Sequence, residues 1–304
     1  QWNIDAKLLE SIQIPLLIYG VGVNNFRGQE SFSYQAIQHI EATCRKAAFI
    51  GLRNNGSLRK LRCLIPEVES QKLFWQPCPT TVLGYLTEIP TRRSPQKLNI
   101  AVNIAMDRAD LRFGDQANSV LAAIAHACHK LQSMGHHIIV VTHAEKDELV
   151  IPYLRKLRFP FRVKRLERCL PEEVILFYSQ TDLTLGMRGH AQMIPFGCGN
   201  AILSIKSHDK LAYFLGDIGH PEWGVEALDP ALADQLFELA RSMAADLGVV
   251  KKQVAMAREM LWDVCQTNLT RIRTILGSDH LPKMRKQASV TQYETPTLRQ
   301  VNVD

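Results

Sequence analysis

Short runs of apolar residues alternate with stretches of helical periodicity from one end of the chain to the other. The runs are rich in branched side chains, which favour buried strands, and turn-forming residues bound them. Such alternation is typical of repeated β-α units that build a parallel sheet. The pattern therefore predicts an α/β fold.

In the first part of the chain, strands are predicted at residues 14–22, 47–53 and 72–79, with helices near 33–46 and 56–64. The segment EIPTRRSPQK then breaks the pattern with prolines and charges, and predicts a linker at residues 90–96. We assign residues 1–89 to a first Rossmann-like domain. With only three strands this domain is thin, so we expect a further N-terminal portion ahead of the first residue.

A second series of β-α units follows the linker. Its strands are predicted at 97–105, 136–143, 161–167, 182–187 and 200–205, and its helices at 115–134, 145–157, 171–179, 190–197 and 208–216. Five such units make a doubly wound sheet, in which ligands bind beyond the carboxyl ends of the strands. A long helical stretch broken near Gly248 completes a second Rossmann-like domain at 97–277, and the polar residues 278–304 predict a disordered tail.

Composition and charge narrow the class of protein. The net charge of +6 is spread along the 304 residues rather than gathered in basic blocks, which argues against a dedicated nucleic-acid binder. It leaves a modest bias toward anionic small molecules or an anionic membrane surface. The seven cysteines are widely spaced without a C-x-x-C pair, and no apolar run reaches the roughly 18 residues of a membrane span. We expect a cytoplasmic protein with reduced thiols.

The most informative stretch is TDLTLGMRGHAQMIPFGCGNAILSI, in which apolar residues surround Arg188 and His190. Because side chains alternate along a strand, we expect these two to emerge together at a strand end, where the following helix favours an anion. Gly189 between them leaves the approach of a ligand open. The alternative is a buried arginine paired with a carboxylate beside a hydrogen-bonded core histidine, and the sequence leaves both interpretations open.

Other strand ends carry similar side chains. Arg53 follows a predicted strand, His143 and Asp147 follow another, and Lys210 lies just beyond a third. Each has a local alternative, since a loop charge can be solvated and helix starts favour acids anyway. Taken together, cationic and imidazole side chains recur where such sheets bind ligands, and an anionic substrate is the economical explanation.

The segment MRGHAQMIPFGCGNAILSIKSHDKLAYFLGDIG resembles the polysaccharide pyruvyltransferase family. That family carries an arginine, one residue and a histidine at a strand end, and a lysine opening the next helix but one, here Arg188, His190 and Lys210. PLLIYGVGVNN, GLRNNGS with Arg53 and Ser57, and HHIIVVTHAEKDE are also similar to family segments. The resemblance covers roughly residues 10 to 220.

The resemblance implies two Rossmann-like domains facing a cleft, as in glycosyltransferase-B folds, and transfer of a pyruvyl group from phosphoenolpyruvate to a sugar as a ketal. Arg188 would bind the carboxylate or phosphate, and His190 would be the general acid or base. The substrate-binding residues would be Arg53, Ser57, His143, Gly189 and Lys210. The chemistry requires neither a metal nor a cofactor beyond phosphoenolpyruvate as donor. A lipid-linked acceptor would place the enzyme at the inner membrane face, whereas a nucleotide-linked acceptor would not.

Two departures from the family pattern bear on the acceptor. A glycine- and asparagine-rich β-α unit normally precedes the segment that begins here, and FWQPCPTT lacks the acid of the family's Asp-Pro pair. Two alternatives therefore accompany the pyruvyltransferase hypothesis. One is a nucleotide-sugar glycosyltransferase or epimerase of the same architecture, and the other is a non-catalytic degenerate homologue.

Overall fold

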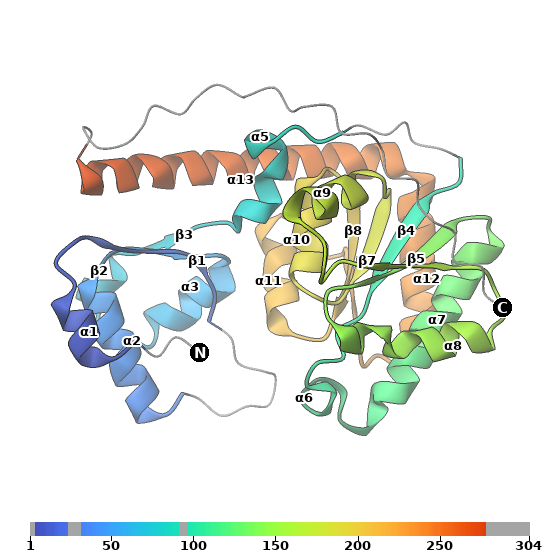
Figure 1. The fold of residues 1–304 in the computed structure, drawn as a ribbon, viewed down its shortest axis with the longest axis horizontal. Helices are drawn as coiled ribbons and strands as arrows, with labels where there is room; N and C mark the ends of the chain where they lie inside the picture. Colours follow the sequence, from blue (N-terminus) through green and yellow to red (C-terminus); the bar gives the residue numbers. More distant parts are fainter. Residues whose placement is uncertain (1–3, 24–31, 91–95, 278–304) are drawn as a thin grey trace. The chain divides into compact units, whose positions relative to one another are not determined.

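The computed structural model describes residues 4–23, 32–90 and 96–277, and the chain forms two compact units. The first unit contains the residues up to Pro79 together with those from Glu259 to the end of the last helix. The second unit runs from Thr80 to Arg258 (Figure 1). Most of the predicted linker and all of the predicted tail lie outside the described residues.

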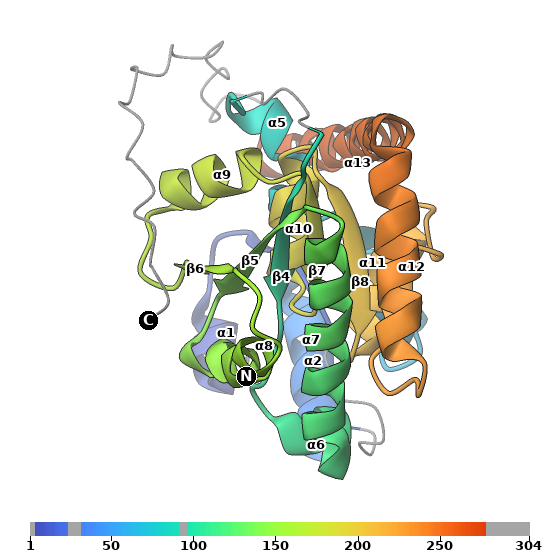
Figure 2. The same cartoon turned by 90° about the vertical axis from the view of Figure 1, so that its right-hand side faces the viewer.

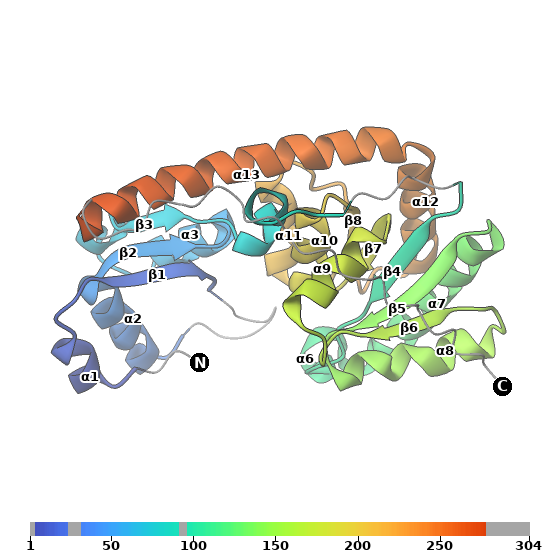
Figure 3. The same cartoon turned by 45° about the horizontal axis from the view of Figure 1, so that its top comes forward.

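The first unit is built on a parallel sheet with the strand order β1-β2-β3. Its elements are α1 (Ala6–Ser11), β1 (Leu16–Val21), α2 (Tyr34–Lys46), β2 (Ala47–Leu52), α3 (Asn55–Arg62), α4 (Glu67–Ser70) and β3 (Leu73–Trp75). Parallel neighbours need a crossover, and α2 and α3 supply the two crossovers (Figure 3). The core between helices and sheet contains Ile18, Ile50, Leu58 and Leu61. The first two strands are close to prediction, and β3 is shorter because Pro77 and Pro79 follow it.

The last helix, α13 (Leu247–Leu276), explains why the first unit is discontinuous in sequence. The fully buried Asn268 donates through Nδ2 to the carbonyl oxygen of Trp75 at 2.6 Å and to Oε1 of Gln76 at 2.9 Å. The guanidinium of Arg271 lies 4.6 Å from the ring centre of Phe74. The end of this helix therefore packs on β3, whereas the sequence assigned it wholly to the second domain.

The second unit has a six-stranded parallel sheet in the order β6-β5-β4-β7-β8-β9. Its strands are β4 (Asn99–Asn103), β5 (His137–Thr142), β6 (Arg162–Arg165), β7 (Leu183–Gly186), β8 (Ala201–Lys206) and β9 (Gly224–Glu226). The first five agree with prediction. The sixth, β9, was not predicted, because three residues are too few to carry a periodic signal.

Helices cover both faces of this sheet. On one face lie α7 (Ala117–Ser133), α8 (Ile151–Lys156) and α12 (Leu232–Ala245), and on the other lie α9 (Pro171–Ser179), α10 (His190–Gly197) and α11 (Asp209–Asp217) (Figure 2). The short elements α5 (Leu83–Leu86), α6 (Ala109–Phe113) and three 3₁₀ turns complete the unit. The chain winds outward from β4 through β5 to β6, and then from β7 through β8 to β9, so the winding direction changes between β4 and β7. Ligands of doubly wound sheets bind at such a switch point.

Candidate functional site

A polar group inside the sheet joins the strands at the switch point. The side chain of Asn103 at the end of β4 is fully buried; its Nδ2 donates to the carbonyl oxygen of Val141 at 2.9 Å. Its Oδ1 accepts from the backbone N–H of Arg188 at 3.2 Å. The amide thus bonds to β5 on one side and to the residues after β7 on the other. This fixes the loop that carries Arg188.

The guanidinium of Arg188 is held by a buried carboxylate. Its Nε donates to Oδ2 of Asp147 at 2.8 Å, and its Nη2 donates to Oδ1 at 2.6 Å. The Asp147 side chain is 0% exposed, and it also accepts from the backbone N–H groups of His143 and Ala144. At this edge, Arg188 matches the alternative considered from the sequence, in which a buried arginine pairs with a carboxylate. The side chain of Arg188 nevertheless remains 20% exposed.

A second carboxylate contacts the other side of Arg188. Nη1 lies 2.9 Å from Oδ1 of Asp107, whose side chain is 43% exposed. Arg112 approaches the same carboxylate at 3.3 Å through Nη2, while its Nη1 donates to Oγ of Ser207. Burial alone would raise the pKa of Asp107, but Arg112 and Arg188 outweigh that effect and lower it. Asp107 therefore stays ionised between two guanidinium groups.

The backbone beside Asp107 is unusual. Arg108 has φ 51, in the left-handed region that non-glycine residues rarely adopt. Such conformations cost of order 1–3 kcal/mol and persist where the surroundings enforce them. The strained residue lies next to the carboxylate that bridges Arg188 and Arg112, in the segment between β4 and α6.

His143 follows β5 and lies in the same cluster. Its Nε2 is 2.8 Å from the hydroxyl of the fully buried Tyr178. The pKa of His143 is lowered to about 4, mainly by burial. Asp147 opposes this shift, and the nearby Arg188 and His190 contribute to it. His143 is therefore a neutral imidazole at pH 7, so it can offer hydrogen bonds but not a positive charge.

His190 and Gly189 lie on the open side of the cluster. The strand ends at Gly186 and Gly189 already has helical torsion angles, so strand alternation does not carry through to His190 as the sequence analysis assumed. Instead, His190 is exposed as the first residue of α10. A Cβ added at Gly189 would meet no atom within 4 Å. The structure therefore brings Arg188, Gly189, His190 and His143 together at the edge of solvent.

Lys210 lies at the next strand end, in the first turn of α11 after β8. Its backbone N–H donates to Nδ1 of His208, which caps that helix. Ser207, in the same loop, accepts from Arg112. The loop after β8 is thus connected to the Asp107 and Arg188 cluster through Arg112.

The remaining predicted residues, Arg53 and Ser57, belong to the first unit. Nε of Arg53 is buried and has no hydrogen-bond partner among the described residues. The guanidinium covers Gly22, where an added Cβ would lie 2.7 Å from Nε. Ser57 is buried near the start of α3, its hydroxyl accepting from the N–H of Val23 at 3.0 Å. Arg53 and Ser57 therefore both contact the segment that follows β1.

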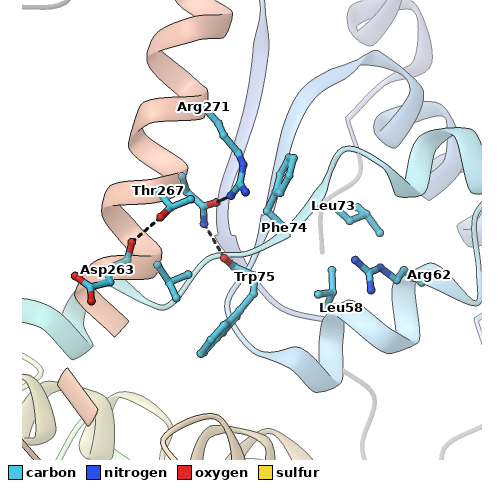
Figure 4. Close-up of a pocket in the computed structure, with 10 residues that line it drawn as sticks. Leu58, Arg62, Leu73, Phe74, Trp75, Asp263, Thr267 and Arg271 are labelled. Atoms are coloured by element: carbon cyan, nitrogen blue, oxygen red, sulfur yellow. Dashed lines mark hydrogen bonds between the residues drawn. The ribbon is translucent and has the colours of Figure 1, made fainter. Parts of the chain in front are cut away.

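A cavity of about 420 Å³ opens elsewhere in the first unit. Its lining is mainly apolar, with Leu58 and Arg62 from α3, Phe74 and Trp75 from β3, and Asp263, Thr267 and Arg271 from α13 (Figure 4). None of the predicted site residues lines it. It lies where α3, β3 and α13 pack together, and we assign it no part in the candidate site.

Sequence reasoning missed Asp107, Arg112 and Asn103, although it identified Asp147. Asp107 follows a predicted strand by only a few residues, and an acid in such a place could have been marked as a candidate by its position alone. Its partner is unpredictable without the strand order, because Arg188 becomes a neighbour only when β7 pairs with β4.

Two Rossmann-like α/β units, the second with a charged cluster at its switch point, define the class of protein. Within that class the chain is a member of the polysaccharide pyruvyl transferase family, whose sequence model matches residues 1–199. This confirms the family predicted from the sequence. No curated protein sequence matches the chain at a significant level.

This chain has the same fold as solved structures of glycosyltransferase-B glycosyltransferases and epimerases. The chain superposes with a TM-score of 0.61 on a Listeria monocytogenes protein assigned as a UDP-N-acetylglucosamine 2-epimerase, at 10% identity over 88% of this chain and 70% of that one. The Neisseria meningitidis UDP-GlcNAc 2-epimerase bound to UDP-GlcNAc superposes with a TM-score of 0.54 and 12% identity, over 86% of this chain and 70% of that one. A glycosyltransferase of Rickettsia africae superposes with a TM-score of 0.51 and 15% identity, over 83% of this chain and 69% of that one. These likenesses establish the fold and carry no residue roles.

Within residues 4–23, 32–90 and 96–277, no helix combines the length and apolar character needed to cross a bilayer. In the same ranges, no three His, Cys, Asp or Glu side chains are grouped so that they could hold a metal ion.

Proposed function

We propose that the chain transfers the pyruvyl group of phosphoenolpyruvate to two hydroxyls of a sugar, forming a ketal. The observation that carries the proposal is the arrangement of Arg188 and His190 at the switch point of a pyruvyl transferase family member. The Arg188 side chain is 20% exposed, and an exposed imidazole follows two residues on. Membership of the family supports the reaction class.

The donor is an anion, and Arg188 is the group that would bind it. A guanidinium forms paired hydrogen bonds with carboxylates and phosphates. Since the buried Asp147 uses the Nε and Nη2 edge, the donor would approach Nη1, on the side now facing Asp107. Lys210, at the next strand end, would contribute a further positive charge, and Gly189 would let the donor approach the backbone.

The reaction needs proton transfers that balance. Two sugar hydroxyl oxygens form bonds to the enol carbon, the methylene gains one proton and becomes a methyl group, and the bond from that carbon to the phosphate oxygen breaks. One hydroxyl proton replaces the proton given to the methylene, and the other leaves with the phosphate. His190 is exposed and adjacent to Arg188, so we assign it one of these transfers as general acid or base.

His143 would act by hydrogen bonding and not by positive charge. Because burial keeps it neutral at pH 7, we propose that it orients the donor or an attacking hydroxyl by hydrogen bonding while Tyr178 fixes its ring. No step is assigned to a metal or to an added cofactor. Arg53 and Ser57 stay predicted substrate-binding residues of the first unit.

The test is release of inorganic phosphate from phosphoenolpyruvate with a panel of nucleotide-linked and lipid-linked sugars, each product being checked for a pyruvyl ketal by mass spectrometry. His190→Ala should lower kcat by roughly 10²- to 10⁴-fold, as expected for loss of a general acid or base. His126→Ala, which removes an exposed histidine on α7, is the matched control and should match wild type.

The alternatives predict different results. Stabilisation by UDP-N-acetylglucosamine in a thermal shift assay, with none by phosphoenolpyruvate, would favour a nucleotide-sugar enzyme of the same fold. A folded chain that consumes no phosphoenolpyruvate with any acceptor and is stabilised by neither ligand would favour the non-catalytic homologue.

A further inference from the structure

Arg188 is shared by two carboxylates that differ sharply in burial. The Asp147 side chain is 0% exposed and that of Asp107 is 43% exposed. Asp147 accepts hydrogen bonds from both Nε and Nη2 of Arg188. Asp107 contacts only Nη1, at 2.9 Å. One carboxylate is therefore part of the protein interior, and the other contacts the guanidinium while partly exposed to solvent.

We propose that Asp107 is an exchangeable counter-ion: it occupies the place of the substrate's anionic group on Arg188 and yields it when that group binds. This inference rests on the proposed function for the identity of the substrate, but the exchange itself requires only an anion. It makes Asp107 a specificity-determining residue. An anion can enter only if it interacts with Arg188 better than the side chain it displaces.

Asp147 cannot be the carboxylate that leaves. It accepts from the backbone N–H groups of His143 and Ala144 at 2.9 and 3.2 Å, and from Nδ2 of Asn103 at 3.3 Å. Moving it would leave those donors and a buried guanidinium edge without an acceptor, which is costly inside a protein. The carboxylate of Asp107, by contrast, is 43% exposed and forms ion pairs with both Arg188 and Arg112.

The structure also provides a second partner for Asp107 after exchange. Both of its carboxylate oxygens already lie 3.3 to 3.4 Å from Nη2 of Arg112. Arg112 is itself fixed, since its Nε donates to the backbone oxygen of Asp107 at 2.9 Å and its Nη1 to Ser207 at 3.1 Å. A small rotation of the Asp107 side chain would break the contact with Arg188 and keep the one with Arg112.

This arrangement implies a preference among anions. A group with two negative charges, such as a phosphate monoester, competes with a single carboxylate for Arg188 better than a monocarboxylate does, because charge attraction in a partly desolvated site grows with the charge. The neutralised guanidinium would thus discriminate against monocarboxylates of similar size.

The experiment is calorimetric titration of inorganic phosphate and of phosphoenolpyruvate into wild type, Asp107→Asn and Asp110→Asn. Asp107→Asn keeps the size of the side chain and removes the competing charge, so both anions should bind roughly three- to tenfold more tightly. Asp110→Asn removes an exposed carboxylate of α6 three residues further on and should bind as wild type does. Asp107→Ala serves as a second variant lacking the charge, and circular dichroism checks that each variant is folded.

The two anions separate this inference from the proposed function. Tighter phosphate binding by Asp107→Asn than by Asp110→Asn supports the exchange, even if phosphoenolpyruvate is bound by neither and the proposed donor is thereby wrong. Phosphate and phosphoenolpyruvate affinities that are unchanged or weaker in both Asp107 variants would overturn the exchange while leaving the donor assignment intact. Absence of phosphate binding in all the proteins would also overturn it.

Discussion

Arg188 and Asp147 meet edge to edge, with Nε to Oδ2 at 2.8 Å and Nη2 to Oδ1 at 2.6 Å. The contact joins the segment after β7 to the segment after β5, on either side of β4 in the sheet. It has a consequence for experiments on the candidate site. Arg188→Ala would leave a fully buried carboxylate without its cation, so lost ligand binding in that variant would mix destabilisation with the loss of a contact.

Asp147→Asn should be strongly destabilising. The substitution leaves the Arg188 edge without a charged partner, and breaking a buried ion pair from one side typically costs about 3–5 kcal/mol. Urea unfolding measures the loss. Glu148→Gln, which removes the partner of the exposed Arg165, is the comparison and should cost at most about 1 kcal/mol. Equal losses in the two variants would contradict the structural role of Asp147.

His143 should make unfolding depend on pH. Its pKa is about 4 in the folded protein against 6.5 when unfolded, so between these values the unfolded chain binds more protons. The contribution of the neutral imidazole to stability is therefore complete above about pH 6.5 and is lost as the pH falls toward 4. The difference in pKa corresponds to about 3 kcal/mol at most. Urea unfolding at several pH values measures the free energy of unfolding of wild type relative to His143→Gln. This difference should increase as the pH is raised from about 4 to about 6.5, and a difference that stays constant would refute the assignment.

Gly189→Ala tests where the anion sits. An added Cβ there meets open space and the torsion angles suit alanine, so we expect the free energy of unfolding to change by less than about 0.5 kcal/mol. A donor lying against the start of α10 would nevertheless lose room, and its Kd should rise several-fold. Gly216→Ala in α11, also in open space but far along another helix, is the control and should leave the Kd unchanged. Equal affinities in all three proteins would place the donor away from Gly189.

Asn268→Ala should weaken the first unit. The side chain is fully buried and bonds to Trp75 and Gln76, while its Oδ1 accepts from Arg271 at 2.6 Å. Truncation leaves these groups unsatisfied, at a cost of roughly 1–3 kcal/mol for each buried group. Thr270→Ala on the exposed side of the same helix should cost less than about 1 kcal/mol. Hydrogen exchange in residues 47–75 would show whether the loss falls on the first unit.

The sequence predicted elements well where local signals were strong. The bounds of α9 and α10 agree with prediction, in α9 because Pro171 opens the helix and Glu173 bonds back to the N–H of Leu170. It failed at β9, which contains three residues, and at the segment 145–150, where a 3₁₀ turn precedes α8. It also could not reveal that α13 ends in the first unit, because only the tertiary contacts of Asn268 and Arg271 show this.

The candidate site was predictable in part. Residue types at strand ends identified Arg188, His190, His143 and Asp147, since position along a strand is a local property. Which carboxylate would meet Arg188, and whether it would be buried, depended on the strand order β5-β4-β7. The structure shows the pairing of Arg188 with carboxylates, one buried and one partly exposed, whereas its role in binding an anion stays a prediction.

Helix α13 has a consequence for how the protein is made. The strands of the first unit are synthesised early, but the residues that pack on β3 are translated only after the entire second unit. Until they emerge from the ribosome, the outer edge of β3 and the aromatic rings of Phe74 and Trp75 stay uncovered on the nascent chain, and uncovered strand edges invite wrong pairing. The second unit can finish folding during translation, whereas the first must wait for the end of α13. Of the two units, the one whose strands are translated earlier is therefore completed later.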